Sequence, residues 1–181
     1  MFPPIPSWDG LHPLVVHFPI ALLLTAPVLV VMALIWRRHE LPLAVAALLI
    51  MALGTVSAVV AAQSGEAADI AGETSAAEAV LERHEALAEV TQGLFAGLTV
   101  LFAAIVFVPR LIRRPMPRPV GVAAGLVFLG LYFAAAVVLA NTAHQGGRLV
   151  HELGLRNPAA AGVTADAAPP AAPDAVAETE P

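Results

Sequence analysis

Hydrophobic and polar residues alternate along this chain in long blocks, and four apolar blocks are long enough to cross a membrane. These blocks run from about Leu14 to Trp36, Leu41 to Ala62, Leu94 to Ile112 and Pro119 to Ala140. An α-helix of about 20 residues crosses the ~30 Å hydrocarbon layer of a bilayer. Backbone groups in lipid must bond internally, and the short alternating strands of a β-barrel are not visible. The pattern therefore predicts an all-α integral membrane protein, a four-helix bundle within residues 14–155.

Composition agrees with this class and narrows the chemistry. Hydrophobic residues make up 59% of the chain and charged residues only 13%, whereas about a quarter of a soluble domain is charged. Cysteine is absent, which excludes disulfides, thiolate metal sites, iron–sulfur clusters and c-type haem attachment. Residues 1–13 lack the positively charged start of a cleavable signal peptide, so we expect this segment to be retained and exported.

Arginine predicts the orientation, because the chain contains no lysine. Arginines cluster after the first block and between the third and fourth blocks, at Arg37, Arg38, Arg110, Arg113, Arg114 and Arg118. The other side holds only Arg83, Arg148 and Arg156, scattered through longer segments. The positive-inside rule then places both clustered linkers in the cytoplasm and both termini outside.

The segment before the third block is expected to form an amphipathic helix. Ser75 and Glu78 have the Ser-x-x-Glu spacing of a capping box, which marks a helix start. Apolar residues then recur at helical spacing from Val80 into the third block, and His84 lies on the same stripe. We therefore expect one unbroken helix whose first turns project beyond the membrane.

Two Gly-x-x-x-Gly patterns, Gly93 with Gly97 and Gly121 with Gly125, lie in the third and fourth blocks. Such patterns favour close helix contacts, either within a bundle or across a homodimer. We interpret both as packing inside the bundle, with a homo-oligomer as the alternative. Residues 156–181 are rich in alanine, proline and acidic residues and have no aromatic residue, so a disordered tail is predicted there.

Five of the six histidines fall at the outer end of this predicted bundle: His12, His17, His84, His144 and His151. Imidazole is costly to hold beside hydrocarbon, so a cluster at one depth indicates a functional site. Neutral imidazole is also the commonest protein ligand for metals. His39 lies between Arg38 and Glu40 in the first cytoplasmic linker, and we interpret it as a solvated residue.

Helix direction places His17 and His144 at similar depth, each as the deeper histidine of its segment. His84 descends towards the same zone on its apolar stripe, so ligands would come from facing helices of the bundle core. The pair Gly146-Gly147 indicates a turn, or a close approach of backbone to a flat ligand. The alternative is that each histidine only hydrogen-bonds a carbonyl at the interface; five at one end favour a site.

A haem b requires two imidazoles on opposite faces of its plane and apolar walls, which this sequence supplies. Copper or zinc would also accept imidazole, with Glu66, Asp69 or Glu85 as added ligands, although small-ion sites usually have tighter local spacing. Neither a His-Glu-x-x-His motif nor a nucleophile triad occurs. Hydrolase chemistry is therefore not expected.

Four motifs resemble those of a bacterial membrane-protein family catalogued as domain of unknown function 2231. They are His-Pro-Leu-Val-Val-His-Phe-Pro-Ile-Ala-Leu from His12, Ser-Gly-Glu-Ala after the second block, His84-Glu85, and His-Gln-Gly-Gly-Arg-Leu-Val from His144. The resemblance covers about residues 10–155 and implies a four-span protein of the bacterial inner membrane. It also implies histidine positions matching His12, His17, His84 and His144, whereas the position of His151 commonly carries tyrosine.

Relatives are similar in domain setting to Rieske-type and cytochrome proteins, which favours electron transfer. The sequence thus predicts a b-type cytochrome-like electron carrier, not an enzyme, with one or two haem b groups near the periplasmic face. Its ligands would come from His12, His17, His84 and His144. Expected partners are membrane lipid and a Rieske-type protein, a cytochrome or a quinol, and no nucleic acid is expected. The alternatives are a copper or other metal-ion site, or a cofactor-free scaffold subunit of a larger complex.

Overall fold

The computed structural model describes residues 11–66, 75–114 and 116–154. Its helices are α1 (His12–Val15), α2 (His17–Ile35), the short η2 (Arg37–His39), α3 (Glu40–Glu66), α4 (Ser75–Leu111) and α5 (Arg118–His151). Those ranges contain no strand, and four helices are long and apolar enough to cross a membrane. The all-α membrane fold expected from the apolar blocks is confirmed. The N-terminal residues 1–10 and the tail predicted over 156–181 lie outside the described residues.

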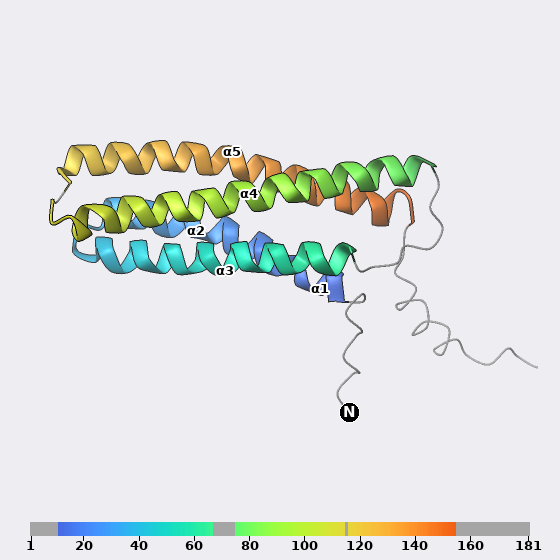
Figure 1. Cartoon of the computed structure of the whole chain (residues 1–181), viewed down its shortest axis with the longest axis horizontal. Coiled ribbons are helices and arrows are strands. Elements are labelled where there is room, and N and C mark those ends of the chain that lie inside the picture. Colours follow the sequence, from blue (N-terminus) through green and yellow to red (C-terminus); the bar gives the residue numbers. More distant parts are fainter. Residues whose placement is uncertain (1–10, 67–74, 115, 155–181) are drawn as a thin grey trace, which may run out of the picture.

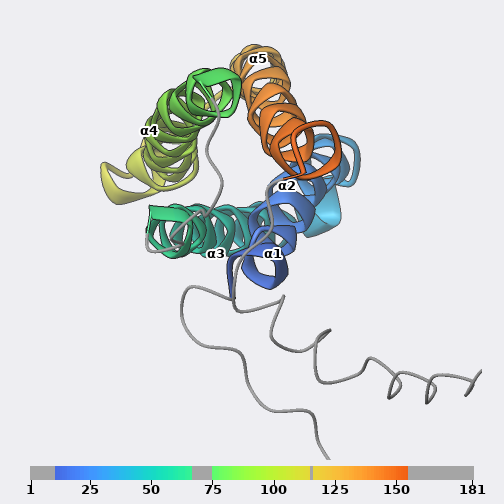
Figure 2. The same ribbon diagram turned by 90° about the vertical axis from the view of Figure 1, so that its right-hand side faces the viewer.

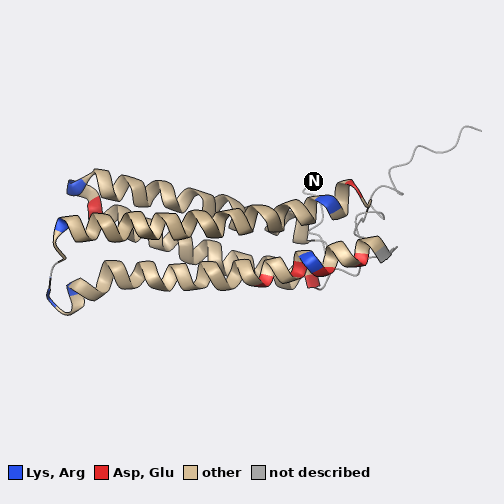
Figure 3. Ribbon diagram, turned by 90° about the horizontal axis from the view of Figure 1, so that it is seen from above, with Lys and Arg blue, Asp and Glu red and all other residues tan. Residues whose placement is uncertain are grey.

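The bundle consists of two helical hairpins, α2 with α3 and α4 with α5 (Figure 1). Viewed along its axis, the first hairpin faces the second around a common centre, with α3 beside α4 and α2 beside α5 (Figure 2). Over the residues with assigned positions, the diagonal pairs α2–α4 and α3–α5 make no close backbone contact. The arginine-bearing linkers lie together at one end and the acidic stretch of α4 at the other (Figure 3).

An apolar core fills the bundle below the histidine-bearing end. Tyr132 of α5 is buried, and its hydroxyl donates to the carbonyl of Leu23 in α2 at 2.7 Å. The ring of Phe95 in α4 packs edge-on against Tyr132, with the two ring centroids 5.2 Å apart. Large apolar side chains such as Val100 and Phe133 point outward, as expected for helices whose outer faces contact lipid. The core therefore ties α2, α4 and α5 together beneath the candidate site.

Helix boundaries agree with the expected blocks at the arginine end and extend further at the other. α4 begins at Ser75 and continues unbroken to Leu111, which confirms the single long helix expected there. The first span is interrupted at Val16, between α1 and α2. Pro19 accounts for the interruption, because it lacks the N–H that would bond the carbonyl of Val15.

The turn expected at Gly146-Gly147 is wrong, because α5 continues as a helix through both glycines to His151. A glycine inside a helix costs ~1 kcal/mol relative to alanine. Packing of α5 against α4 along this stretch offsets that cost. The second interpretation of the glycine pair, a close approach at the backbone, is the one that the packing of Gly146 supports.

The two Gly-x-x-x-Gly patterns have different environments. Gly125 packs inside the bundle, and a β-carbon there would lie 2.7 Å from Cδ2 of Leu34 in α2. Gly93 and Gly97 are exposed, with no neighbouring atom within 4 Å of a β-carbon placed on either. Internal packing is therefore the wrong interpretation for the pattern on α4. A homo-oligomer through this face stays a prediction.

Candidate functional site

The structure separates the five histidines expected at the outer end by their exposure. His12 and His84 are half-buried, whereas His17, His144 and His151 are exposed. His17 was expected to contribute a ligand to the bundle core, and this is wrong: it is exposed, and its Nδ1 donates to the carbonyl of Pro13 at 2.8 Å, one turn earlier in the chain. His12 and His17 diverge by about 140° on a regular helix, so only one of them can face the bundle.

His144 and His151 also point outward, because other residues occupy the buried face of α5. Thr142, Gln145 and Leu149 take the buried positions of this part of α5, at the spacing of one helix face. His144 and His151 each follow a buried residue by two positions, which places both on the exposed side. The position in the bundle core that was expected for His17 and His144 is therefore not what the fold produces.

His12 lies at the start of the first span and contacts the end of α3. Its Nδ1 is 2.8 Å from the carbonyl oxygen of Ala61 and 3.1 Å from Oγ of Ser64, which is completely buried. Ser64 donates its own proton to the same carbonyl at 2.8 Å. A β-carbon on Gly65 would lie 2.9 Å from Cε1 of His12. The ring thus rests on backbone that only a glycine leaves open.

His84 makes the corresponding contacts between α4 and α5. Its Nδ1 is 2.9 Å from the carbonyl oxygen of Thr142, and a β-carbon on Gly146 would lie 3.0 Å from its Cε1. The hydroxyls of Thr91 and Thr142 lie 2.9 Å apart directly below this contact. Both residues are buried, and the contact between their hydroxyls joins α4 to α5. It lies beside the Thr142 carbonyl that accepts the hydrogen bond from His84.

These contacts determine the tautomer of both imidazoles. A carbonyl oxygen can only accept a hydrogen bond, so Nδ1 carries the proton in His12 and in His84. In a neutral ring Nε2 then holds the free lone pair. Within the described ranges no hydrogen bond reaches Nε2 of either ring.

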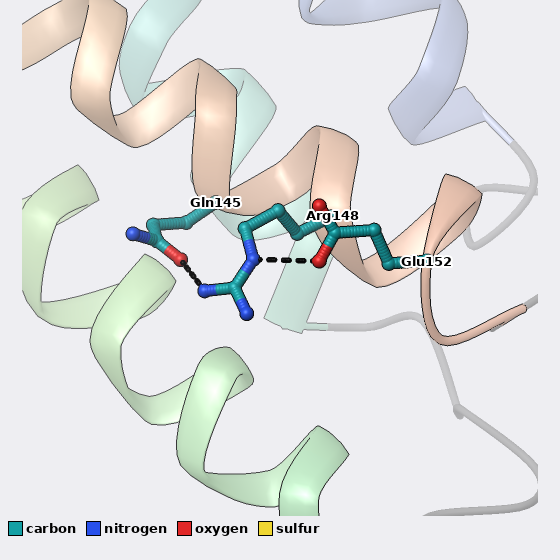
Figure 4. A network of polar contacts seen from close by, with 3 residues as sticks. All are labelled: Gln145, Arg148 and Glu152. Carbon is teal, nitrogen blue, oxygen red and sulfur yellow. Dashed lines mark hydrogen bonds and ion pairs between the residues drawn. The ribbon is translucent and has the colours of Figure 1, made fainter.

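A network of polar contacts lies at the histidine-bearing end of α5 (Figure 4). Arg148 donates through Nε to Oε2 of Glu152 at 2.9 Å and through Nη1 to Oε1 of Gln145 at 3.1 Å. Gln145 is buried beside Gly146, while Arg148 and Glu152 are partly exposed. Partly exposed ion pairs contribute little to stability by themselves. All three residues lie at the end of α5, so these contacts connect only its last turns.

Among the residues that the structure describes, no three of His, Cys, Asp or Glu come together as a metal-ion site. Glu66 and Glu85 are exposed, and Asp69 lies outside the described residues. For the copper or zinc site considered from the sequence, His12 and His84 are the half-buried histidines among the described residues.

Sequence reasoning missed the residues that hold these two rings. Ser64, Gly65 and Gly146 were visible in the Ser-Gly-Glu-Ala and His-Gln-Gly-Gly motifs, but their contacts depend on which helix packs opposite each histidine. The available signal was that each histidine motif had a glycine motif at the same expected depth. The histidine and glycine motifs that meet here lie at one end of the bundle, but the sequence did not reveal the helix phase.

A family model described as a predicted membrane protein (DUF2231) matches residues 9–159. This range includes α1 to α5 and both half-buried histidines, and the match confirms the resemblance drawn from the motifs. No curated protein and no solved structure matches the chain.

Proposed function

The chain belongs to this family of predicted membrane proteins, and we propose, from the geometry of its two half-buried histidines, that it is a b-type cytochrome-like electron carrier. In this proposal His12 and His84 bind one haem b at the end of the bundle opposite the arginine-rich linkers. The observation that supports it is that both imidazoles have the same tautomer and the same kind of hydrogen-bond partner. Each donates Nδ1–H to a backbone carbonyl of its partner helix, which leaves Nε2 free to ligate.

Hydrogen bonding at Nδ1 is the usual companion of histidine ligation. Such a bond fixes the ring orientation and raises the basicity of the ligating nitrogen. Here the acceptors are the carbonyls of Ala61 and Thr142, on helices that the bundle packing holds rigidly. The two rings come from different hairpins, so a ligand between them would bridge the halves of the bundle, which is how helix bundles commonly hold cofactors.

Haem suits this pair better than a small ion does. Haem iron requires only two axial imidazoles, because the porphyrin supplies its other ligands. A copper or zinc ion needs three or four protein donors, and the described residues offer no such group. When bound, haem supplies reversible one-electron chemistry. The exposed positions of His17 and His144 limit the proposal to one haem.

The proposed location is the periplasmic side of a bacterial inner membrane, with both termini periplasmic. Six arginines lie at the opposite end of the bundle, in or beside the two short linkers, at Arg37, Arg38, Arg110, Arg113, Arg114 and Arg118. That distribution supports a cytoplasmic location for this end. A site confined to one face cannot move electrons through the whole membrane. Its partner would therefore be a Rieske-type protein, a cytochrome or a quinol reaching the same face.

An absorption spectrum of the protein purified in mild detergent tests the proposal. We expect a Soret band that sharpens and shifts on reduction with dithionite, at one haem per chain. A colourless protein with stoichiometric copper would support the metal-ion alternative. A protein that holds neither after expression with added haem precursor would overturn the proposal and leave the scaffold role.

A further inference from the structure

The two hairpins are arranged as repeats of each other. Each begins at the histidine-bearing end, descends to the arginine end and returns: α1 and α2 then α3, and α4 then α5. The contacts between hairpins follow the same pattern, since α3 packs on α4 as α5 packs on α2. This order of helices and these neighbours are the ones that an approximate two-fold axis along the bundle would produce. Parallel repeats of this kind, related by an axis along the membrane normal, are a known architecture of membrane proteins.

The ends of the two ascending helices show the same repeat at the level of single residues. Segment 61–66 of α3 reads Ala-Ala-Gln-Ser-Gly-Glu, and segment 142–147 of α5 reads Thr-Ala-His-Gln-Gly-Gly. In both, the first and fourth residues are buried and the third is exposed. In both, the carbonyl of the first residue accepts from an imidazole, at 2.8 Å in α3 and 2.9 Å in α5.

The fifth residue of each segment is the glycine that touches the same imidazole. The β-carbon positions of Gly65 and Gly146 lie 2.9 Å and 3.0 Å from Cε1 of His12 and His84. Distances this short leave no room for a methyl group unless the ring moves. Carbonyl and glycine are one helical turn apart, so together they fix both the direction of Nδ1–H and the depth of the ring.

We infer that the bundle carries two equivalent half-sites, in which Gly65 and Gly146 are paired positioning residues that aim His12 and His84 at a shared ligand. Each half-site has the same three parts: an imidazole from a descending helix, and a carbonyl and a glycine from the ascending helix of the same hairpin. The inference deepens the proposed haem function by naming the residues that orient its ligands. It rests on that function only for the identity of what the rings bind.

The equivalence predicts effects confined to one ring at a time. In Gly65→Ala the added methyl group would displace the His12 ring and break its bond to Ala61, and His84 would be unaffected. In Gly146→Ala the His84 ring would lose its bond to Thr142, and His12 would be unaffected. Gly147→Ala is the matched control, because Gly147 is the adjacent glycine in the same helix and has no atom within 4 Å of its β-carbon position.

Long-range 1H–15N spectra of cofactor-free protein, labelled with 15N-histidine in detergent micelles, report the protonation and environment of each imidazole directly. His12→Ala and His84→Ala assign the two signals. We expect a protonated Nδ1 and an unprotonated Nε2 for both rings in the parent chain and in Gly147→Ala. Each of the other glycine variants should shift or broaden only the signals of its own histidine. Unchanged spectra in Gly65→Ala and Gly146→Ala, or an equal effect of Gly147→Ala, would overturn the inference.

A double substitution keeps the test decisive if a glycine variant folds poorly. Removing the ring removes the clash, so Gly146→Ala should lower the midpoint of thermal unfolding in the parent chain and leave it unchanged in a His84→Ala background. The same relation should hold for Gly65→Ala with His12→Ala. An equal effect in both backgrounds would show that the glycines serve helix packing alone.

The haem proposal has a separate readout. If the glycine variants alter the ring signals as expected but the parent chain binds no haem, the half-sites stand and the haem function fails. If haem binds and the glycine variants leave both the ring signals and the haem spectrum unchanged, the function stands and the positioning role fails.

Discussion

The imidazole of His84 in α4 lies against the backbone of Gly146 in α5, so closely that a β-carbon there would lie 3.0 Å from its Cε1. The same ring donates Nδ1–H to the carbonyl of Thr142, one turn earlier in α5. An aromatic ring held on two sides by backbone has little freedom to rotate. This contact explains why α5, which packs along α4, carries a glycine at position 146.

Substitution of the half-buried histidines should separate them from the exposed ones. We expect His12→Ala and His84→Ala each to abolish haem retention, because each would remove one of the two axial ligands. His17→Ala and His144→Ala should keep the haem, since both side chains face outward. The Soret absorbance per chain after purification gives the comparison. Loss of haem in the exposed pair, with retention in the half-buried pair, would refute our ligand assignment.

Removal of the Ser64 hydroxyl should weaken the His12 half of the site. Ser64 is completely buried and lies 3.1 Å from Nδ1 of His12. Ser64→Ala should lower the free energy of unfolding by about 0.5–1.5 kcal/mol, the usual value of one hydrogen bond. Ser57→Ala is the control, because Ser57 is a half-buried serine of the same helix that donates to the carbonyl of Leu53. Thermal unfolding in detergent would measure both, and equal losses would contradict the prediction.

A methyl group at Gly125 should disturb the contact between the hairpins. The β-carbon of Gly125→Ala would lie 2.7 Å from Cδ2 of Leu34, so we expect a loss of about 1–3 kcal/mol from overpacking. Gly97→Ala has open space at its β-carbon position and should be neutral or slightly stabilising, because alanine favours helix. Unfolding midpoints compare the two variants. A larger loss for Gly97→Ala would instead indicate that the exposed face of α4 packs against a second copy.

The absence of native cysteine makes the orientation simple to test. We expect Glu82→Cys, near the histidine-bearing end of α4, to react with a membrane-impermeant maleimide in intact spheroplasts. Glu40→Cys, at the arginine end, should react only after the membrane is permeabilised, by the positive-inside rule. Both changes remove one exposed carboxylate, so their effects on net charge match. The reverse labelling pattern would place the site in the cytoplasm.

The sequence by itself determined the four membrane-crossing helices, their approximate spans and the end at which five histidines gather. These features follow from block length and charge placement, because the bilayer fixes how many apolar residues a helix needs. The sequence also indicated that α4 begins at Ser75, where the helix does begin. Such features are local, and no contact between distant residues is needed to infer them.

Only the tertiary structure decided which histidines turn towards the bundle. In a soluble protein the apolar stripe of a helix marks its buried face. In this bundle the lipid-facing side chains are equally apolar, as the exposed Val100 and Phe133 illustrate. Hydrophobic pattern therefore cannot distinguish inside from outside along the spans. The helix phase that turns His12 and His84 inward and His17 and His144 outward is set by the packing of α1 on α3 and of α4 on α5.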